Sequence, residues 1–176
     1  GYFHGKTKHY NTLGLSEIIN YNSNIKHGVY IKFNVLKQIK GIGRFVNNKL
    51  NGIFKINTYN NLLIKQLNFK NDVLCGKYIE YGIIKRVYQF DNNILDGYYT
   101  EYVYGKKRLK IKFLKNKFDN IYKTYDFSER LTTEIIITYN GYKVKKYKRG
   151  KLLYIFCKLN DKYYLSINEH IMLLTP

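Results

Sequence analysis

Residues 69–78 read Phe-Lys-Asn-Asp-Val-Leu-Cys-Gly-Lys-Tyr, and this pattern decides the fold because it returns along the whole chain. In order, it contains an aromatic residue, a polar pair, an apolar residue, an anchor that is most often glycine, and a second aromatic residue. Successive anchors are 23, 24, 24, 21, 23, 21 and 20 residues apart, a period near 22 that predicts a repeat architecture. The anchors are Gly5, Gly28, Gly52, Gly76, Gly97, Asn120, Gly141 and Asp161.

An aromatic residue stands seven positions before the anchor in six of seven cases, and we predict that it forms the core of the repeats. The polar pair that follows, such as Asn47-Asn48, predicts a tight turn, because Asn and Asp tolerate left-handed backbone conformations. Each unit is therefore expected to contain two short strands. In residues 108–113 cations alternate with apolar residues, which predicts one charged and one apolar face. The predicted core residues are Tyr21, Phe45, Phe69, Phe90, Phe113 and Tyr154.

Four phrases around the anchors resemble the MORN repeat, in the variant form of bacterial and giant-virus proteins. The resemblance covers the whole chain and implies a meander of β-hairpins stacked into an elongated, twisted single sheet. It also implies roles in scaffolding, protein interaction and, for some members, association with acidic lipid. The chain differs from the family pattern in having no Trp. The phrases are Asn51-Gly52-Ile53-Phe54, Cys75-Gly76-Lys77-Tyr78, Asp96-Gly97-Tyr98-Tyr99 and Asp119-Asn120-Ile121-Tyr122.

We accordingly expect one all-β domain over residues 1–176 with about seven repeat units. The seventh unit departs from the pattern. Glu134 stands where the aromatic residue is expected, and residues 135–137 are an uninterrupted run of Ile. A bulge, a register change or a covered strand is expected there.

Residues 166–176 are expected to cap the end of the sheet. Ser166 and Glu169 have the spacing of a helix capping box, in which each side chain bonds the backbone of the other residue. The positions of Ile167, Ile171 and Leu174 fit one face of a helix. These features predict a short helix over residues 167–174, and the alternative is one more strand.

The composition excludes several protein classes. The chain has no Ala and one Pro but 20 Asn, 21 Ile and 20 Tyr, which argues against a helical bundle. With 45% hydrophobic residues it is too apolar for a disordered chain. No run approaches the roughly 18 apolar residues of a membrane span. Since the chain also has no leader pattern and no Asn-x-Ser/Thr site, we expect a cytoplasmic protein that is not secreted.

The charge balance is strongly basic. With 31 Lys and Arg against 12 Asp and Glu the net charge is +19, which predicts attraction to nucleic acid, acidic lipid or acidic protein. Cations gather in residues 106–117 and 143–151 beside aromatic residues, as in surfaces that bind single-stranded nucleic acid or phosphates. The alternative is a solvated strand face. The candidate residues are Lys106, Lys107, Arg108, Lys110, Lys112, Lys143, Lys145, Lys146, Lys148 and Arg149.

No motif predicts a catalytic or metal site. Cys75 and Cys157 are isolated, and the four His residues have no ligand spacing. Residues 41–43, Gly-Ile-Gly, lack the third glycine of a dinucleotide loop and are interpreted as a turn or bulge. Glu80 and Glu101 each follow an anchor by four residues, and we expect each to form a cross-strand ion pair worth roughly 0.2 to 1 kcal/mol. We therefore expect neither an enzyme nor a cofactor.

The expected function is a non-enzymatic repeat scaffold or interaction module that presents a basic, Tyr-rich sheet face to a protein partner. The alternative is a polyanion-binding module for nucleic acid or an acidic membrane surface. Open sheet ends also favour self-association by strand addition. Residues with AT-rich codons make up 98 of 176. With the repeat type, this bias favours a large DNA virus as the source, and a virion or assembly component located in the virion or the host cytoplasm.

Overall fold

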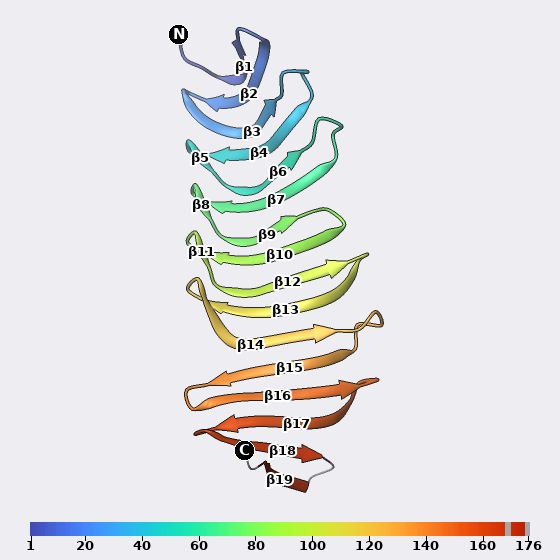
Figure 1. Cartoon of the computed structure of the whole chain (residues 1–176). Coiled ribbons are helices and arrows are strands. Elements are labelled where there is room, and N and C mark those ends of the chain that lie inside the picture. The colour runs from blue at the N-terminus through green and yellow to red at the C-terminus, as the bar shows by residue number, and fades with distance from the viewer. Residues whose placement is uncertain (168–169, 175–176) are drawn as a thin grey trace. The chain divides into compact units, whose positions relative to one another are not determined.

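The structure is a computed structural model, and it describes residues 1–167 and 170–174. The described residues form nineteen strands and no helix, and the strands make one antiparallel sheet of successive hairpins (Figure 1). The predicted all-β meander is therefore confirmed. The strands are β1 (Gly5–Asn11), β2 (Gly14–Asn22), β3 (Ile25–Phe33), β4 (Ile39–Val46), β5 (Lys49–Leu50), β6 (Gly52–Asn57), β7 (Leu63–Lys70), β8 (Val73–Leu74), β9 (Gly76–Glu80), β10 (Ile84–Asp91), β11 (Ile94–Leu95), β12 (Gly97–Val103), β13 (Lys106–Leu114), β14 (Lys117–Tyr125), β15 (Leu131–Thr138), β16 (Gly141–Lys148), β17 (Lys151–Leu159), β18 (Lys162–Ile167) and β19 (His170–Leu174).

The chain divides into two compact units. The N-terminal unit comprises residues 1–82 and 87–94, and the C-terminal unit comprises residues 83–86 and 95–176. Within each unit the strands are neighbours in the sheet in their chain order, as β2 and β3 are in the first and β15 and β16 in the second.

Neither unit contains a conventional hydrophobic core. Among the described residues the only buried hydrophobic side chain is that of Ile19, which is 3% exposed. The six predicted core side chains are all half-buried. A single-layer sheet explains this burial, because each face of a strand is covered only by side chains of adjacent strands.

Five polar pairs form tight turns between successive strands, as predicted, and Asn160-Asp161, whose Asp161 was interpreted as an anchor, forms a sixth. In each pair the first residue has φ between 47° and 53° and the second between 60° and 69°. Two consecutive left-handed residues are typical of a type I′ turn, whose twist matches that of the hairpin. The pairs are Ser23-Asn24, Asn47-Asn48, Asn71-Asp72, Asn92-Asn93, Lys115-Asn116 and Asn160-Asp161.

The second residue of each regular turn is hydrogen-bonded to the preceding hairpin. Asn48 donates its backbone N–H to the carbonyl of Lys26 over 2.9 Å, and its Oδ1 accepts the N–H of Lys26 over 2.8 Å. Every partner stands two positions before an anchor, so these bonds account for the fixed spacing of the repeat. We call this set the turn ladder. It pairs Asn24 with Phe3, Asn48 with Lys26, Asp72 with Leu50, Asn93 with Leu74 and Asn116 with Leu95.

Anchor glycines lie opposite the predicted aromatic residues on the adjacent strand. Their φ values, +78° at Gly52 for example, lie in the left-handed region that glycine adopts without strain. A ring can cover the bare backbone of a glycine, which explains why the two residue types recur together. The pairs in the sheet are Gly5 with Tyr21, Gly28 with Phe45, Gly52 with Phe69, and Gly97 with Phe113.

Tyr154 does not share this position. It lies opposite Lys146, and the residue opposite Gly141 is Leu159. The reason is the turn: Asp161 is itself a turn residue, whereas a regular anchor follows its turn by four residues. Tyr154 is therefore half-buried but stands at another level of the sheet.

Of the bulge, register change or covered strand that were expected in the seventh unit, the structure shows a register change. Gly141 follows its hairpin turn directly, and β15 pairs with β16 without a bulge. Ile135 consequently pairs with Tyr122 and Val144, while Glu134 points to the opposite face, as strand alternation requires.

Two sequence interpretations contain an error. Gly41 and Gly43 lie inside β4 and form no turn, although the register between β3 and β4 shifts directly beside Gly41. A Cβ at Gly43 would lie 2.4 Å from Cδ2 of Phe54, so these glycines make room for a ring that lies across the strand. The second error concerns the end of the chain.

The predicted C-terminal helix is not formed by residues 170–174. They form β19, in which Ile171 pairs with Ser166 and Leu174 pairs with Tyr163. Pairing along a neighbouring strand outweighs the preference of so short a segment for a helix. Glu169, the second residue of the proposed capping box, lies outside the described residues. Separately, no helix among the described residues has the length and apolarity to cross a membrane.

Candidate functional site

The two predicted basic clusters lie in the C-terminal unit, on β13 and β16 and at their ends. Strand alternation places their side chains on two faces. We define the basic face of this unit as the face that carries the cross-strand row Thr100, Lys110, Lys123, Glu134 and Lys145. Lys110 and Lys145 stand three strand spacings apart, about 14 Å, so the structure brings the two clusters onto one surface.

Aromatic rings hold several cations of the basic face in place. The Nζ of Lys110 lies 3.7 Å from the centre of the Tyr98 ring, and the Nζ of Lys107 lies 4.2 Å from that of Tyr125. Such contacts attract a cation to the ring by roughly 0.5 to 1 kcal/mol at exposed sites. The predicted interleaving of basic and aromatic residues is therefore present as direct contacts.

Glu134 occupies the centre of the basic face between two lysines. Its carboxylate oxygens lie 2.8 Å from the Nζ of Lys123 and 2.8 Å from the Nζ of Lys145. The hydrogen bonds from Lys123 and Lys145 hold the pKa of the Glu134 carboxyl below its ordinary value of 4.5, and the bond to Glu134 raises the pKa of Lys123. This carboxylate neutralises part of the charge that the sequence assigns to the second cluster.

A second acidic residue engages the first cluster. The Nζ of Lys112 lies 2.6 Å from an oxygen of Asp119, and this hydrogen bond raises the pKa of the Lys112 ammonium. Lys110 and Lys143 form no ion pair with the residues that the structure describes. An anion that approaches this face is therefore attracted mainly by cations other than Lys112 and Lys145.

The remaining candidates are dispersed. Lys106, Lys148 and Arg149 are exposed at hairpin ends, and the Arg108 guanidinium lies 4.1 Å from the ring centre of Phe127. Lys146 points to the opposite face, where its Nζ donates to Oγ1 of Thr133 over 3.0 Å. The ten predicted residues thus form no single site.

We call the face opposite the basic face the aromatic face of the C-terminal unit, and we give the same name to the face of the N-terminal unit that carries Glu17 and Glu80. In the N-terminal unit it carries carboxylates that each accept a tyrosine hydroxyl and meet a cation. Tyr78 donates to Glu80 over 2.8 Å, and Lys65, on the adjacent strand, lies 3.3 Å from Glu80. The bond from Tyr78 is the main reason that the pKa of the Glu80 carboxyl is lowered.

The same arrangement recurs at two other glutamates. Glu17 accepts the hydroxyl of Tyr30 and pairs with Lys32 over 3.6 Å. Glu101, in the C-terminal unit, accepts the hydroxyl of Tyr99 and pairs with Arg86 over 3.5 Å. The ion pairs predicted for Glu80 and Glu101 are confirmed, whereas the tyrosine hydroxyls were missed, although Tyr recurs two residues before both glutamates.

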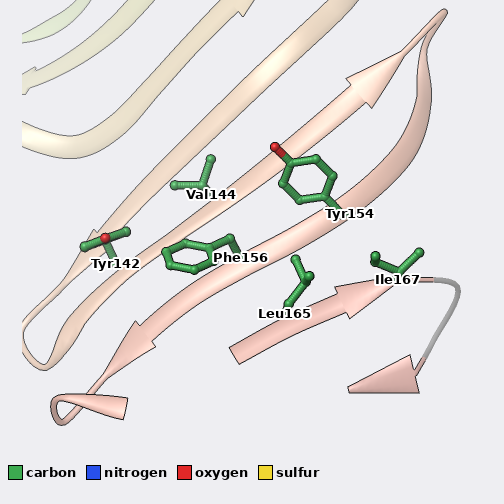
Figure 2. Close-up of a pocket in the computed structure, with 6 residues that line it drawn as sticks. All are labelled: Tyr142, Val144, Tyr154, Phe156, Leu165 and Ile167. Atoms are coloured by element: carbon green, nitrogen blue, oxygen red, sulfur yellow. The ribbon is translucent and has the colours of Figure 1, made fainter. Parts of the chain in front are cut away.

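An apolar groove of about 580 Å³ lies on the aromatic face of the C-terminal unit. Figure 2 shows its six side chains on β16, β17 and β18, with the Tyr154 hydroxyl pointing toward β16. No sequence motif indicated this groove, because it depends on the register of three strands. It is lined by Tyr142, Val144, Tyr154, Phe156, Leu165 and Ile167.

Metal-ligating side chains do not cluster in the part of the chain that the structure describes: no group of three His, Cys, Asp or Glu could hold an ion. Cys75 and Cys157 are both free thiols.

Comparison with known proteins does not identify the chain: no protein-family model matches it, and no curated protein matches its sequence.

Proposed function

We propose that the chain is a non-enzymatic repeat scaffold that presents the basic face of its C-terminal unit to an acidic protein partner. The observation that carries the proposal is the ordering of cations on this face. Lys107 and Lys110 lie on tyrosine rings, and Lys145 is bonded to Glu134. Charges that are already held in place cost less side-chain entropy when a partner binds.

Rings and cations together suit a protein partner. Tyrosine supplies a large contact area with few rotatable bonds, and ordered lysines recognise carboxylates. The resemblance to MORN repeats supports the same role. The proposal requires no cluster of nucleophile, base and orienting group.

The second candidate function is binding of a polyanion, either nucleic acid or an acidic membrane surface. Its supporting observation is the absence of ion-pair partners for Lys110 and Lys143 among the described residues. Two ion pairs favour the protein partner instead. Asp119 already pairs with Lys112 and Glu134 already pairs with Lys145, so these carboxylates reduce the attraction of the face for a polyanion.

A charge-reversal experiment tests both candidates. The variant Lys107→Glu, Lys110→Glu and Lys143→Glu removes three cations of the basic face whose side chains form no ion pair with the described residues. Its matched control, Lys40→Glu, Lys49→Glu and Lys70→Glu, changes the net charge equally at exposed sites of the N-terminal unit.

Native protein is purified with and without nuclease and high salt, and bound molecules are identified. The scaffold is supported if a stoichiometric protein stays bound to the wild type after both treatments. This protein should also bind the control variant and should not bind the basic-face variant. Loss of nucleic acid or acidic liposomes from the basic-face variant, with a steep salt dependence in the wild type, supports the alternative. If both variants keep every partner, the basic face is not the binding surface.

For location we propose the cytoplasm, including the cytoplasm of a host cell, or a virion as an assembly component. The composition bias and the repeat resemblance support this proposal. Immunogold labelling of infected cells and purified particles is its test, and exclusive labelling of a membrane-enclosed compartment would contradict it.

A further inference from the structure

We propose that the groove on the aromatic face of the C-terminal unit binds a protein segment in which apolar side chains flank one carboxylate, and that Lys146 receives this carboxylate. The site is distinct from the basic face and does not depend on the function proposed above. The argument compares one cross-strand row of the C-terminal unit with the equivalent row of the N-terminal unit.

In the N-terminal unit, this row contains two cations, and each has a glutamate directly opposite. Lys32 stands opposite Glu17, and Lys65 stands opposite Glu80. The ion-pair distances are 3.6 Å and 3.3 Å. A tyrosine hydroxyl also donates to each glutamate, from Tyr30 and from Tyr78 respectively.

The row of the C-terminal unit begins in the same way and ends differently. Glu101 pairs with Arg86, but Lys146 at the far end stands opposite Thr133. The Nζ of Lys146 meets only the Thr133 hydroxyl, at 3.0 Å, and forms no ion pair with the described residues. The row is Glu101, Leu109, Thr124, Thr133, Lys146 and Tyr154.

Among the described residues, Lys146 thus lacks a carboxylate of the kind that Lys32, Lys65 and Arg86 have. It is half-buried, so water screens its charge less than that of an exposed lysine. Its cross-strand partner Tyr154 lines the groove and directs its hydroxyl toward β16 (Figure 2). An ammonium and a tyrosine hydroxyl are the two donors that each glutamate of the N-terminal row receives.

The groove determines the rest of the ligand. Val144 and Phe156 stand opposite each other at its centre, and Leu165 extends the apolar surface to β18. Apolar side chains gain free energy by leaving water for such a surface. A free anion would engage Lys146 without using the groove, so the combination favours a protein segment that supplies both groups.

The test uses short acetylated and amidated peptides, each with one central Glu among varied apolar and hydroxyl residues, and matched peptides with Gln. Binding to the full chain is measured by fluorescence anisotropy, and the site is located by methyl NMR. We expect peptides that shift the methyl signals of Val144 and Leu165 while leaving that of Ile155, on the other face of β17, unchanged. The Gln peptides should bind at least about tenfold more weakly than the Glu peptides, because a charge-assisted hydrogen bond is lost.

Two variants of the chain probe the carboxylate. Thr133→Glu places a glutamate opposite Lys146, as Glu17 stands opposite Lys32. This glutamate should pair with the Lys146 ammonium in place of the peptide carboxylate and lower peptide affinity about tenfold. Lys146→Gln should lower affinity by a similar factor without adding bulk at Thr133. Lys70→Gln, a matched loss of charge at an exposed site of the N-terminal unit, should leave peptide affinity unchanged.

Circular dichroism first checks that each variant keeps its β structure, so that a loss of peptide binding is not caused by unfolding. If no Glu peptide binds, or if Lys146→Gln binds as tightly as the wild type, the proposal is wrong. If vesicles of anionic lipid shift the methyl signals of the groove and none of the peptides does, the groove binds lipid and the proposed protein segment is wrong.

Discussion

The hairpins of the N-terminal unit and the hairpins β15–β19 differ in what holds neighbouring strands together. The former have the turn ladder, with bonds such as that of Asn48 to Lys26, and glutamates such as Glu80 that join tyrosine to lysine. In hairpins β15–β19 the described residues keep one backbone bond between successive turns, from Asn160 to Asn140, but no turn side chain bonds to the preceding hairpin and no glutamate joins tyrosine to lysine. Their aromatic face has an open groove, and the side chains of β19 are all exposed. The difference teaches that repetition in this chain maintains side-chain bonds between hairpins, and that accessible apolar surface appears where those side-chain bonds end.

The largest expected effect tests the close packing of the N-terminal unit. Gly43→Ala places a Cβ against the Phe54 ring and should destabilise the unit by about 1 to 3 kcal/mol. Val144→Ile also adds bulk, but the groove has room for it, so stability should change by no more than about 0.5 kcal/mol. Urea denaturation measures both changes. Equal losses would show that the two regions are packed alike.

The next effect concerns the turn ladder. Asn48→Ala removes the side-chain bond to Lys26 and places alanine at φ 68°, a left-handed conformation that it adopts less readily than Asn. We therefore expect a loss of about 1 to 2 kcal/mol of unfolding free energy. Asn48→Gly keeps the left-handed backbone and should recover part of this loss.

Asn140→Ala is the matched change in the irregular turn. Asn140 has no such side-chain bond and no left-handed φ, so its substitution should cost less than about 0.5 kcal/mol. Thermal melting of the three variants gives the order. A loss at Asn140 as large as that at Asn48 would contradict the role given to the ladder.

The smallest effect is a dependence on pH. The pKa values of the Glu80 and Glu134 carboxyls are lowered in the folded chain by their hydrogen-bond donors, so their stabilisation is complete above the ordinary value of 4.5. It is lost as the pH falls below that value and through the folded pKa.

Glu134→Gln should therefore lower stability near neutral pH by about 1 kcal/mol or less, and should flatten the decrease in melting temperature between about pH 5 and pH 3. Amide exchange should place this change on β14–β16 and not on β17–β18. A wild-type melting temperature that rises on acidification would contradict the assignment.

Much of the fold could be predicted from the sequence, because its determinants are local. The pair Asn47-Asn48 specifies its own turn, and the recurrence of Gly52 after it marks the next strand. A cross-strand ion pair for Glu80 was expected from the same period, although its partner Lys65 was not named. Each of these predictions required only spacing within one repeat or between neighbours.

What could not be predicted depends on register across several strands. Tyr154 keeps the spacing to its anchor but stands opposite Lys146, because the anchor moved into the turn. The Gly-Ile-Gly of residues 41–43 was interpreted as a turn or bulge, but the period could not show that Gly41 and Gly43 make room for the Phe54 ring on β6. The groove depends on how β16–β18 are aligned, and the position of Lys146 opposite Thr133 depends on the alignment of β15 and β16. The period alone does not specify these alignments.

The turn ladder also gives the chain a direction of assembly. Each ladder residue bonds to a residue that precedes it by 19 to 22 positions, as Asn93 does to Leu74 and Asn48 does to Lys26. A ribosome releases the earlier residue first, so every new hairpin emerges beside a template that is already complete. Contacts between nearby parts of the sequence form quickly, and the cost of closing each loop is small. Synthesis can therefore extend the ladder one hairpin at a time, with each finished edge covered by the next hairpin soon after it forms.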